Sequence, residues 1–468
     1  MTDVQAMVAA GDLSFLDEQP LNDWIVAQRW FASKTREVAH IDIVDAVPLR
    51  ADSPLLLLCL VEARFPAGTH ETYQVPLGLR PVDDGWEDRV ILETDGWVVY
   101  DALSDPAAGR ELLHRMRSNT ELQSGQDEFI FRWAESAGAG LGGTVDVRPV
   151  GVEQSNSSIV FGEDLILKAF RRVEPGVNPE LELLRLLSAR GFPHIAPLAG
   201  WYEVEGRLID ATLGILQEYL AGAHDGWELA LDELQSDPDG LLDRLQALGR
   251  VVGEMHTALA SDASNPAFSA DEPSAEALSI LTANVDEQIE RVFLDLPETE
   301  AVAPIVGRGQ DVRERLAALS NVGVGGRVIR THGDLHLGQT MLSDRGWVIL
   351  DFEGEPARPL PERRLKRSPL RDVAGMLRSF SYATAGSRLL RGHEAPPDWE
   401  DRARRRFLDG YHEAVDRYLL PPGQQATDQL LAVFELEKAV YELRYELNNR
   451  PDWVSIPVAG ILRLLESD

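Results

Sequence analysis

The sequence contains a single cysteine, Cys59, so it has neither a disulfide within the chain nor a zinc site built from cysteines. It also lacks a long apolar segment, because the longest unbroken apolar run, Leu55–Val61, is far too short to cross a bilayer. Nor does its N-terminus show a basic region followed by an apolar core, which is the pattern of a secretory signal. These absences predict a cytoplasmic protein.

Basic side chains are in short supply: 45 Lys and Arg stand against 77 Asp and Glu, which gives a net charge of −32. This balance argues against general binding to nucleic acid or to an anionic membrane, since phosphate-binding surfaces need clustered Lys and Arg. It is still compatible with an ATP site, because a local basic group and Mg²⁺ can offset the background charge. The acidic residues are dispersed along the chain, which indicates a solvated surface.

The composition, 44% apolar and 26% charged, is that of an ordinary globular protein, and 468 residues can bury two or three cores. Residues 1–100 read as a small mixed domain. Its predicted elements are a helix at 21–32 and strands at 41–47, 54–63, 72–79 and 90–99, separated by Gly and Pro. A helix is predicted next, over 101–122.

A second part, ending near residue 219, has the element order of a kinase small lobe. Its predicted elements are strands at 147–153, 158–161 and 164–170, a helix at 179–190, and further strands over 200–219. The remainder, 220–468, is mainly helical. Its predicted helical segments are 241–259, 275–319 with a break at Pro304, 370–385, 400–418 and 427–448.

The most informative segment is Thr331-His-Gly-Asp-Leu-His-Leu-Gly-Gln339, followed by Val348-Ile-Leu-Asp-Phe-Glu-Gly-Glu355. It places Asp334 five residues before Gln339 and seventeen before Asp351. These are nearly the offsets that kinases use between a catalytic Asp, an amide metal ligand and a metal-holding Asp. One carboxylate would orient a substrate hydroxyl, while the amide and the second carboxylate would hold Mg²⁺ against a triphosphate.

Residues 341–350 are predicted to form a short hairpin, because apolar residues flank the turn Ser343-Asp344-Arg345-Gly346. Such a hairpin would return the two metal-ligand candidates to one place. The alternative is a polar loop before a buried strand, which three acidic or amide groups at these offsets make the poorer interpretation.

Lys168, near the end of an apolar strand, could reach nucleotide phosphates as a point charge. The following helix offers Glu180 and Glu182 as its acidic partner. Only one of them can face the strand, and Glu182 is the first choice. The alternative is an edge-strand lysine that keeps the edge soluble.

Two further segments are candidates for the nucleotide. The polar loop Gln154, Ser155, Asn156 and Ser157 stands where a glycine-rich phosphate loop is expected, and its N–H groups could cradle an anion as a nest. Such runs are also common in simple turns. The segment Gln217, Glu218 and Tyr219 falls where a kinase hinge would bind adenine through backbone groups.

Three histidines are candidate functional residues. His332 and His336 flank Asp334, but they lie in a loop without the H-E-x-x-H pattern of a metal site. His332 is expected to support this loop by hydrogen bonding and is counted on the substrate side of the site. His256, on an amphipathic helix, is expected to be a packing residue.

Near the C-terminus, spacings of three and four place Lys438, Tyr441, Glu442 and Tyr445 on one stripe of a helix, with Trp453 beyond it. Aromatic rings interleaved with charged groups suit a sugar, which offers apolar C–H faces and a rim of hydroxyls. The alternative is an amphipathic helix with packed tyrosines and solvated charges.

On these motifs the sequence resembles the actinobacterial maltokinases, which make maltose 1-phosphate from ATP and maltose for α-glucan and glycogen synthesis. The resemblance runs along essentially the whole chain. Its motifs are Gln28-Arg-Trp-Phe31, Glu153-Gln-Ser-Asn-Ser157, the Lys168 strand, the Asp334 and Asp351 segments, Ser368-Pro-Leu-Arg-Asp-Val-Ala-Gly375, Lys438-Ala-Val-Tyr-Glu442 and Arg450-Pro-Asp-Trp453.

The resemblance implies an α+β, bilobal, protein-kinase-like fold. Its parts would be an N-terminal cap subdomain over 1–100, an intermediate or small lobe over 101–219, and a helical C-lobe over 220–468. It implies Asp334 as catalytic base, Gln339 and Asp351 as Mg²⁺ ligands, Lys168 on the ATP phosphates, and a sugar near Tyr441, Glu442 and Tyr445. It also implies that the chain could assemble with other enzymes of α-glucan synthesis.

Three alternatives stay open at this point. Related actinobacterial kinases phosphorylate glucosamine, so another sugar could be the acceptor. The His-Gly-Asp and Asp-Phe-Glu motifs are shared with aminoglycoside and choline kinases. A non-catalytic, nucleotide-binding kinase-like protein is the third alternative, which the complete acidic set argues against.

Overall fold

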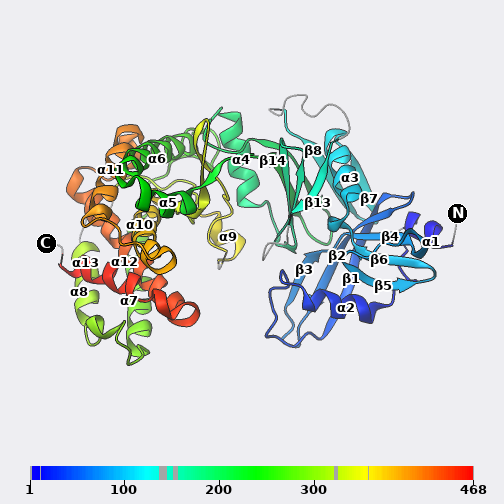
Figure 1. Ribbon diagram of the computed structural model, residues 1–468, viewed down its shortest axis with the longest axis horizontal. Coiled ribbons are helices and arrows are strands. Elements are labelled where there is room, and N and C mark those ends of the chain that lie inside the picture. The colour runs from blue at the N-terminus through cyan, green and yellow to red at the C-terminus, as the bar shows by residue number, and fades with distance from the viewer. Residues whose placement is uncertain are drawn as a thin grey trace. The chain divides into compact units, whose positions relative to one another are not determined.

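The computed structural model describes residues 3–10, 12–135, 145–150, 156–320, 325–356 and 358–466 (Figure 1). Gln154 and Ser155, predicted to belong to a phosphate-binding loop, lie outside these residues. The chain divides into two compact units. One comprises Met1–Ser188 and Ala196–Ala221, and the other comprises Ala189–Ile195 and Gly222–Asp468. The predicted subdivision at residue 100 falls inside the first unit and stays a prediction.

The first unit contains two antiparallel sheets. The first has the strand order β12-β3-β2-β4-β6-β5, and β1 also pairs with β2. Its strands are β1 (His40–Arg50), β2 (Leu55–Arg64), β3 (His70–Gln74), β4 (Leu77–Pro81), β5 (Val90–Thr94), β6 (Trp97–Asp101) and β12 (Arg172–Val173). Helices α1 (Asp3–Ala9) and α2 (Glu18–Ala27) pack on this sheet.

The second sheet has the order β7-β8-β13-β14-β11-β10-β9. Its strands are β7 (Glu121–Ser124), β8 (Asp127–Trp133), β9 (Val147–Val150), β10 (Asn156–Phe161), β11 (Leu165–Phe170), β13 (Leu198–Glu205) and β14 (Ala211–Glu218). Helix α3 (Pro106–Arg117) packs against β8 and β9, and α4 (Pro179–Ala189) follows β12.

Strand β2 explains how the two sheets share the first unit. Its residues alternate between two cores, because successive side chains of a strand point to opposite faces. Leu57 and Val61 belong to the core under α1 and α2, whereas Leu56 and Leu58 belong to the core that also contains α3 and the second sheet. The longest apolar run of the sequence is therefore a strand buried on both faces.

Two buried polar side chains join the same sheets. The Arg171 guanidinium is 1% exposed and lies 2.5 Å from the Asp101 carboxylate at the end of β6. The Gln74 amide, at the end of β3, donates to the carbonyls of Phe170 and Leu213, each at 2.9 Å. These bonds pair polar groups that would be costly to bury alone, although Arg171 Nη1 has no partner among the described residues.

The second unit is mainly helical. Its helices are α5 (Gly226–Ser236), α6 (Pro238–Leu259), α7 (Ala275–Leu294), α8 (Gly309–Ser320), α9 (Leu360–Arg363), α10 (Leu370–Arg391), α11 (Trp399–Ala414), α12 (Gln424–Asn449) and α13 (Ser455–Glu466). A small sheet of β15 (His224–Asp225), β16 (Thr340–Ser343) and β17 (Gly346–Ile349) completes the unit. None of the helices in the described part of the chain is long and apolar enough to cross a membrane.

Helices α6 and α11 approach closely because glycine lies at their contact. A Cβ atom at Gly410 would stand 1.9 Å from the Gln246 carbonyl oxygen, and one at Gly249 would stand 2.0 Å from that of Phe407. This contact fixes α6, which carries His256, against α11, which carries Tyr411.

The predicted elements differ from the structure in several places. Residues 72–79 form parts of β3 and β4 rather than one strand, and residues 90–99 form the hairpin β5–β6. The helix predicted over 101–122 begins at Pro106, because Asp105 caps it by accepting from the Ala107 N–H at 2.8 Å. Strands β7 and β8 and helices α5 and α13 were not predicted.

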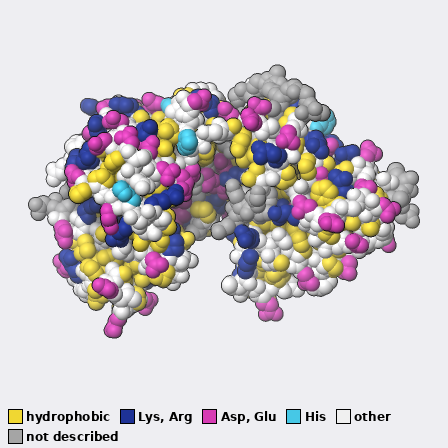
Figure 2. Space-filling view, in the orientation of Figure 1, with side chains coloured by type: hydrophobic (Ala, Val, Ile, Leu, Met, Phe, Trp, Pro, Cys, Tyr) yellow, Lys and Arg dark blue, Asp and Glu magenta, His cyan; other side chains and the backbone are white. Residues whose placement is uncertain are grey.

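Charged side chains are interspersed over the visible face of each unit (Figure 2).

Candidate active site

The loop 331–338 is held by the buried carboxylate of Asp372 in the first turn of α10. Its oxygens accept the backbone N–H groups of His332 at 2.8 Å and Gly333 at 2.9 Å. Helix α10 lies so close to this loop that a Cβ at Gly375 would be 2.6 Å from the Leu335 carbonyl oxygen. Gly333 itself has φ +86°, a conformation that favours glycine. The backbone on either side of Asp334 is therefore fixed.

The His332 ring completes this support. Its Nε2 lies 2.7 Å from the Leu350 carbonyl oxygen, and its Nδ1 accepts the Asp334 N–H at 3.3 Å. Both ring nitrogens are therefore paired with backbone groups. The expected loop-supporting role is thus confirmed. Its placement on the substrate side is wrong, because His332 is 1% exposed and both ring nitrogens face backbone groups.

Behind Asp372, two buried side chains extend the hydrogen-bond chain. His256 Nε2 lies 3.1 Å from Asp372 Oδ2, and His256 Nδ1 lies 3.1 Å from the Tyr411 hydroxyl. Burial raises the pKa of Asp372, but hydrogen bonding to His256, the charges of His256 and His332 and the Gly333 N–H more than offset it, so its pKa is lowered. A buried carboxylate thus stays ionised and anchors the loop. His256 is a packing residue, as predicted, with an added hydrogen-bonding role.

Asp334 projects from this loop toward Lys438 of α12, whose Nζ lies 3.2 Å from Asp334 Oδ1. Burial opposes ionisation of Asp334, but the charge of Lys438, together with His336 and His332, outweighs it and lowers the pKa of the carboxyl. Asp334 is therefore ionised at neutral pH and can accept a hydrogen bond from a substrate hydroxyl.

The predicted hairpin is present and brings the two metal-ligand candidates together. Strands β16 and β17 pair Thr340 with Ile349, and Gln339 Nε2 donates to Asp351 Oδ2 at 2.9 Å. Asp351 has φ +60°, a strained conformation for a residue other than glycine and one that is frequent at functional sites.

These residues fit a hard divalent cation. A carboxylate and an amide oxygen are ligands that Mg²⁺ accepts, and the amide nitrogen bond leaves Oε1 of Gln339 for an ion. Mg²⁺ ligation by Gln339 and Asp351 stays a prediction.

Replacing Asp351 by alanine is expected to weaken Mg²⁺-dependent ATP binding about tenfold, since a carboxylate ligand is lost. Calorimetric titration of ATP with and without Mg²⁺ measures this change. Asp344→Ala, in the exposed hairpin turn, is the matched control. Mg²⁺-independent ATP affinity in the wild type would contradict the metal assignment.

In the first unit, Lys168 lies on β11, between β10 and β14. Its Nζ is 3.0 Å from Glu180 Oε2. The choice of Glu182 as its partner is therefore wrong. Glu180 is 1% exposed on the buried face of α4, whereas Glu182, about 200° further round the helix, is partly exposed.

The other nucleotide candidates are backbone-paired positions. Asn156 and Ser157 belong to β10, opposite Phe170 and Ala169, so the prediction of a loop is wrong for these two residues. Both are buried, and Ser157 Oγ accepts from Arg171 Nε at 2.8 Å. The strand register of β10 with β11 extends two residues further than the apolar pattern indicated.

The hinge candidates lie at the end of β14. Gln217 Nε2 donates to the Ala196 carbonyl at 3.4 Å. The N–H groups of Glu218 and Tyr219 donate to the carbonyls of Pro197 and Asp164, at 3.0 and 2.8 Å. Adenine binding at this segment stays a prediction.

A cavity of about 600 Å³ opens beside Asp334 in the second unit. It brings together the predicted sugar-side residues Lys438, Tyr441, Glu442 and Tyr445. Its remaining lining residues are Trp227, His336, Gly338, Glu355, Pro356, Gly375, Ser379, Tyr382, Glu446, Arg450 and Trp453. Its volume lies within the range of about 300–1,000 Å³ that is usual for small-molecule sites.

Aromatic residues of this cavity come from four elements. The Trp453 ring stacks on that of Tyr382, with centroids 6.0 Å apart and planes 18° apart, and it lies 6.4 Å from that of Trp227. Tyr382 and Trp227 were not predicted, because α10 and α5 reach the cavity only through tertiary packing. The Tyr382 hydroxyl donates to Glu446 Oε1 at 2.9 Å.

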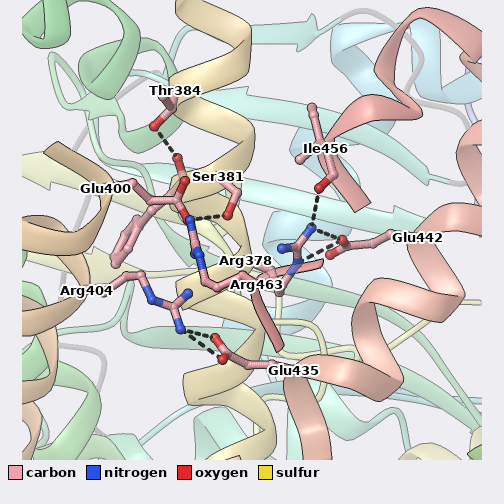
Figure 3. Close-up of polar contacts among 10 residues, drawn as sticks. Arg378, Ser381, Thr384, Glu400, Arg404, Glu435, Glu442, Ile456 and Arg463 are labelled. Atoms are coloured by element: carbon pink, nitrogen blue, oxygen red, sulfur yellow. Dashed lines mark hydrogen bonds and ion pairs between the residues drawn. The ribbon is translucent and has the colours of Figure 1, made fainter. Parts of the chain in front are cut away.

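Behind the cavity wall, Arg378 of α10 holds Glu442 in place. Its Nε and Nη2 donate to Glu442 Oε2 at 2.9 and 2.7 Å, and Nη2 also faces the Ile456 carbonyl (Figure 3). A Cβ at Gly460 would stand 2.1 Å from Nη1 of this guanidinium, so a larger residue there would displace the arginine. Further pairs in the same view, Arg404 with Glu435 and Arg463 with Glu400, tie α11, α12 and α13 together (Figure 3).

Comparison with known proteins shows which family the chain belongs to. Residues 146–412, more than half of the chain, match the family model described as phosphotransferase enzyme family, and the chain belongs to that family. Residues 24–105 match the maltokinase N-terminal cap domain, so the resemblance to maltokinases within this kinase superfamily is confirmed. The mixed, kinase-like fold class with a cap and a helical C-terminal part is confirmed as well.

Curated relatives include two glucosamine kinases. That of Streptacidiphilus jiangxiensis is 28% identical over 68% of this chain and 73% of its own length. That of Mycolicibacterium smegmatis is 27% identical over 72% of this chain and 82% of its own length.

Solved glucosamine kinase structures share the fold. One, in complex with glucosamine, ADP and inorganic phosphate, has a TM-score of 0.69 at 21% identity and covers 95% of this chain and 98% of its own. Another, crystal form B, has a TM-score of 0.71 at 21% identity, with 99% of both chains covered.

Proposed function

We propose that this protein transfers the γ-phosphoryl group of ATP to the anomeric oxygen of maltose and forms maltose 1-phosphate for α-glucan synthesis. The match to the maltokinase N-terminal cap domain supports maltose as the acceptor. ATP as donor is supported by the phosphotransferase family and by a similar kinase solved with ADP. The observation that supports the proposal most directly is the cavity beside Asp334, which is lined by aromatic rings and by charged groups in ion pairs.

In this mechanism Asp334 orients the anomeric hydroxyl and accepts its proton late in the transfer. Lys438 keeps the carboxylate ionised, and Asp372 fixes the loop that carries it. Mg²⁺, held by Gln339 and Asp351, would neutralise charge on the phosphates. Lys168, oriented by Glu180, would contact the phosphates as a point charge.

The charges of the cavity favour a neutral sugar. The four carboxylates among its described lining residues are each paired: Asp334 with Lys438 at 3.2 Å, Glu355 with Arg358 at 2.6 Å, Glu442 with Arg378 at 2.7 Å and Glu446 with Arg450 at 2.6 Å. An ammonium group would find no uncompensated carboxylate there and would meet Lys438 beside the reacting hydroxyl. Neutral hydroxyls can donate to the carboxylate oxygens that these pairs leave open.

Glucosamine is the second candidate acceptor, because both curated relatives described above are glucosamine kinases. An acceptor screen with labelled ATP, followed by NMR of the product, separates the two. We expect maltose 1-phosphate as the product. A preference for glucosamine, or phosphorylation at the 6-position, would refute maltose, and the absence of any transfer would favour a non-catalytic nucleotide-binding protein.

Tyr441→Ala is expected to raise KM for maltose about tenfold and to leave KM for ATP nearly unchanged, since loss of one stacked ring costs roughly 1 kcal/mol or somewhat more. Steady-state kinetics with each substrate varied in turn measures both constants. Tyr418→Ala serves as the control, because Tyr418 is 55% exposed and lies outside the lining of this cavity. Equal effects on both KM values would contradict a specific role of Tyr441 in maltose binding.

A further inference from the structure

A second cavity of about 650 Å³ shares Asp334, Glu355, Gly375, Lys438 and Tyr441 with the first. Arginines distinguish its other walls. Five of them line it: Arg291, Arg358, Arg367, Arg371 and Arg444. The proposed sugar transfer assigns no role to this cavity beyond the shared residues.

Most charges on these walls compensate one another. Arg358 Nε lies 2.6 Å from Glu355 Oε2, and Arg371 Nη2 lies 2.8 Å from Glu437 Oε1. Arg367 differs from these two: in the described part of the chain its guanidinium has neither a hydrogen bond nor an ion pair, which among the five arginines is otherwise true of the exposed Arg444. Its backbone alone is fixed, by two hydrogen bonds to Ile329.

The surroundings of Arg367 disfavour its positive charge. Burial lowers its pKa, and the neighbouring charges of Arg371 and Arg358 lower it further, against weaker opposite effects of Glu437 and Glu362. The carboxylates nearby are engaged with other arginines and do not neutralise it. An anion between these guanidinium groups would relieve the repulsion.

We propose that Arg367, with Arg358 and Arg371, binds the phosphate group of a phosphate monoester. Guanidinium groups suit phosphate because their paired N–H donors match its oxygens, and a dianion compensates more than one of them. The shared wall of Lys438 and Tyr441 is available to a sugar attached to that phosphate. The ligand is then the sugar phosphate product or free phosphate, and the product assignment rests on the proposed function.

The test is binding without turnover. Inorganic phosphate and maltose 1-phosphate are titrated calorimetrically into the full chain with ADP and Mg²⁺ at saturation, so that the nucleotide site is filled. Arg367→Gln is expected to weaken phosphate binding at least tenfold. Arg367→Lys is expected to weaken it less, because lysine keeps the positive charge but lacks the paired N–H donors of the guanidinium. Arg388→Gln, on an exposed part of α10, is the matched control and is expected to bind as the wild type does.

A second readout separates a ligand site from a structural arginine. Without phosphate, Arg367→Gln should have a Tm equal to or above that of the wild type, because a repelled charge is removed. With phosphate, Tm should rise in the wild type and not in the variant. A lower Tm of the unliganded variant, or unchanged phosphate affinity, would overturn the proposal.

Tighter binding of maltose 1-phosphate than of phosphate identifies the ester as the ligand, and equal binding identifies the free anion. Failure of maltose phosphorylation would leave these binding results intact.

Discussion

Replacing Asp334 by asparagine is expected to lower kcat by about 10²- to 10⁴-fold, the usual contribution of a positioned proton acceptor. An amide keeps the shape of the side chain, but it cannot accept the proton of the sugar hydroxyl. The Lys438 ion pair is lost as well, so the orientation of the remaining group is weakened. Single-turnover kinetics with ATP at saturation measures the chemical step directly.

ATP affinity and Tm are the controls for this variant, and both should stay close to those of the wild type. Asp344→Asn, ten residues further along in the exposed hairpin turn, is the matched substitution and should turn over normally. Near-normal kcat in Asp334→Asn would exclude Asp334 as the proton acceptor and with it the proposed mechanism.

Replacing Asp372 by alanine is expected to reduce the free energy of unfolding by about 3–5 kcal/mol, as for other buried charges that lose their partner. The change leaves the N–H groups of His332 and Gly333 and the ring of His256 without their acceptor. The loop that carries Asp334 would lose its anchor, so activity should fall with stability. Urea unfolding and kcat/KM are the two measurements.

The control for this variant is Asp295→Ala, because Asp295 is an exposed residue at the end of α7. A double-mutant cycle with His256→Leu tests whether the two side chains act together: strong coupling is expected, and additive effects would argue against the network. The lowered pKa of Asp372 sets the pH window. Its contribution is present above the ordinary carboxyl pKa and is lost as the pH falls through the lower, folded-state value.

The residues of the site that could be predicted from the sequence are those that lie close together along the chain or on one helix. Asp334, Gln339 and Asp351 lie within eighteen residues, and one hairpin sets the distance between the last two. Most strands of the first unit were likewise readable from Gly, Pro and apolar runs, but β7 and β8 were not. The positions of Lys438 and Tyr441 on one helix face followed from helical spacing.

What could not be predicted depends on tertiary packing. The choice between Glu180 and Glu182 is made by which face of α4 is buried, and the signal that favours Glu180 is its helical spacing to Leu184 and Leu187. Asn156 and Ser157 are polar residues in a strand because Arg171 and neighbouring strands satisfy them. Tyr382 and Trp227 reach the cavity from α10 and α5, which are separated from α12 by long stretches of sequence.

The double burial of β2 has a consequence for how the first unit folds. Since alternate residues of one strand complete two cores, neither core can lose this strand without exposing apolar surface in the other. The cap region and the second sheet should therefore unfold in one cooperative step, as a single foldon, and their amide protons in β2 and β8 should exchange with similar protection. A fragment cut after β6 would leave Leu56, Leu58 and Leu60 facing water. The cap is therefore expected to aggregate when expressed alone rather than to fold as an independent domain.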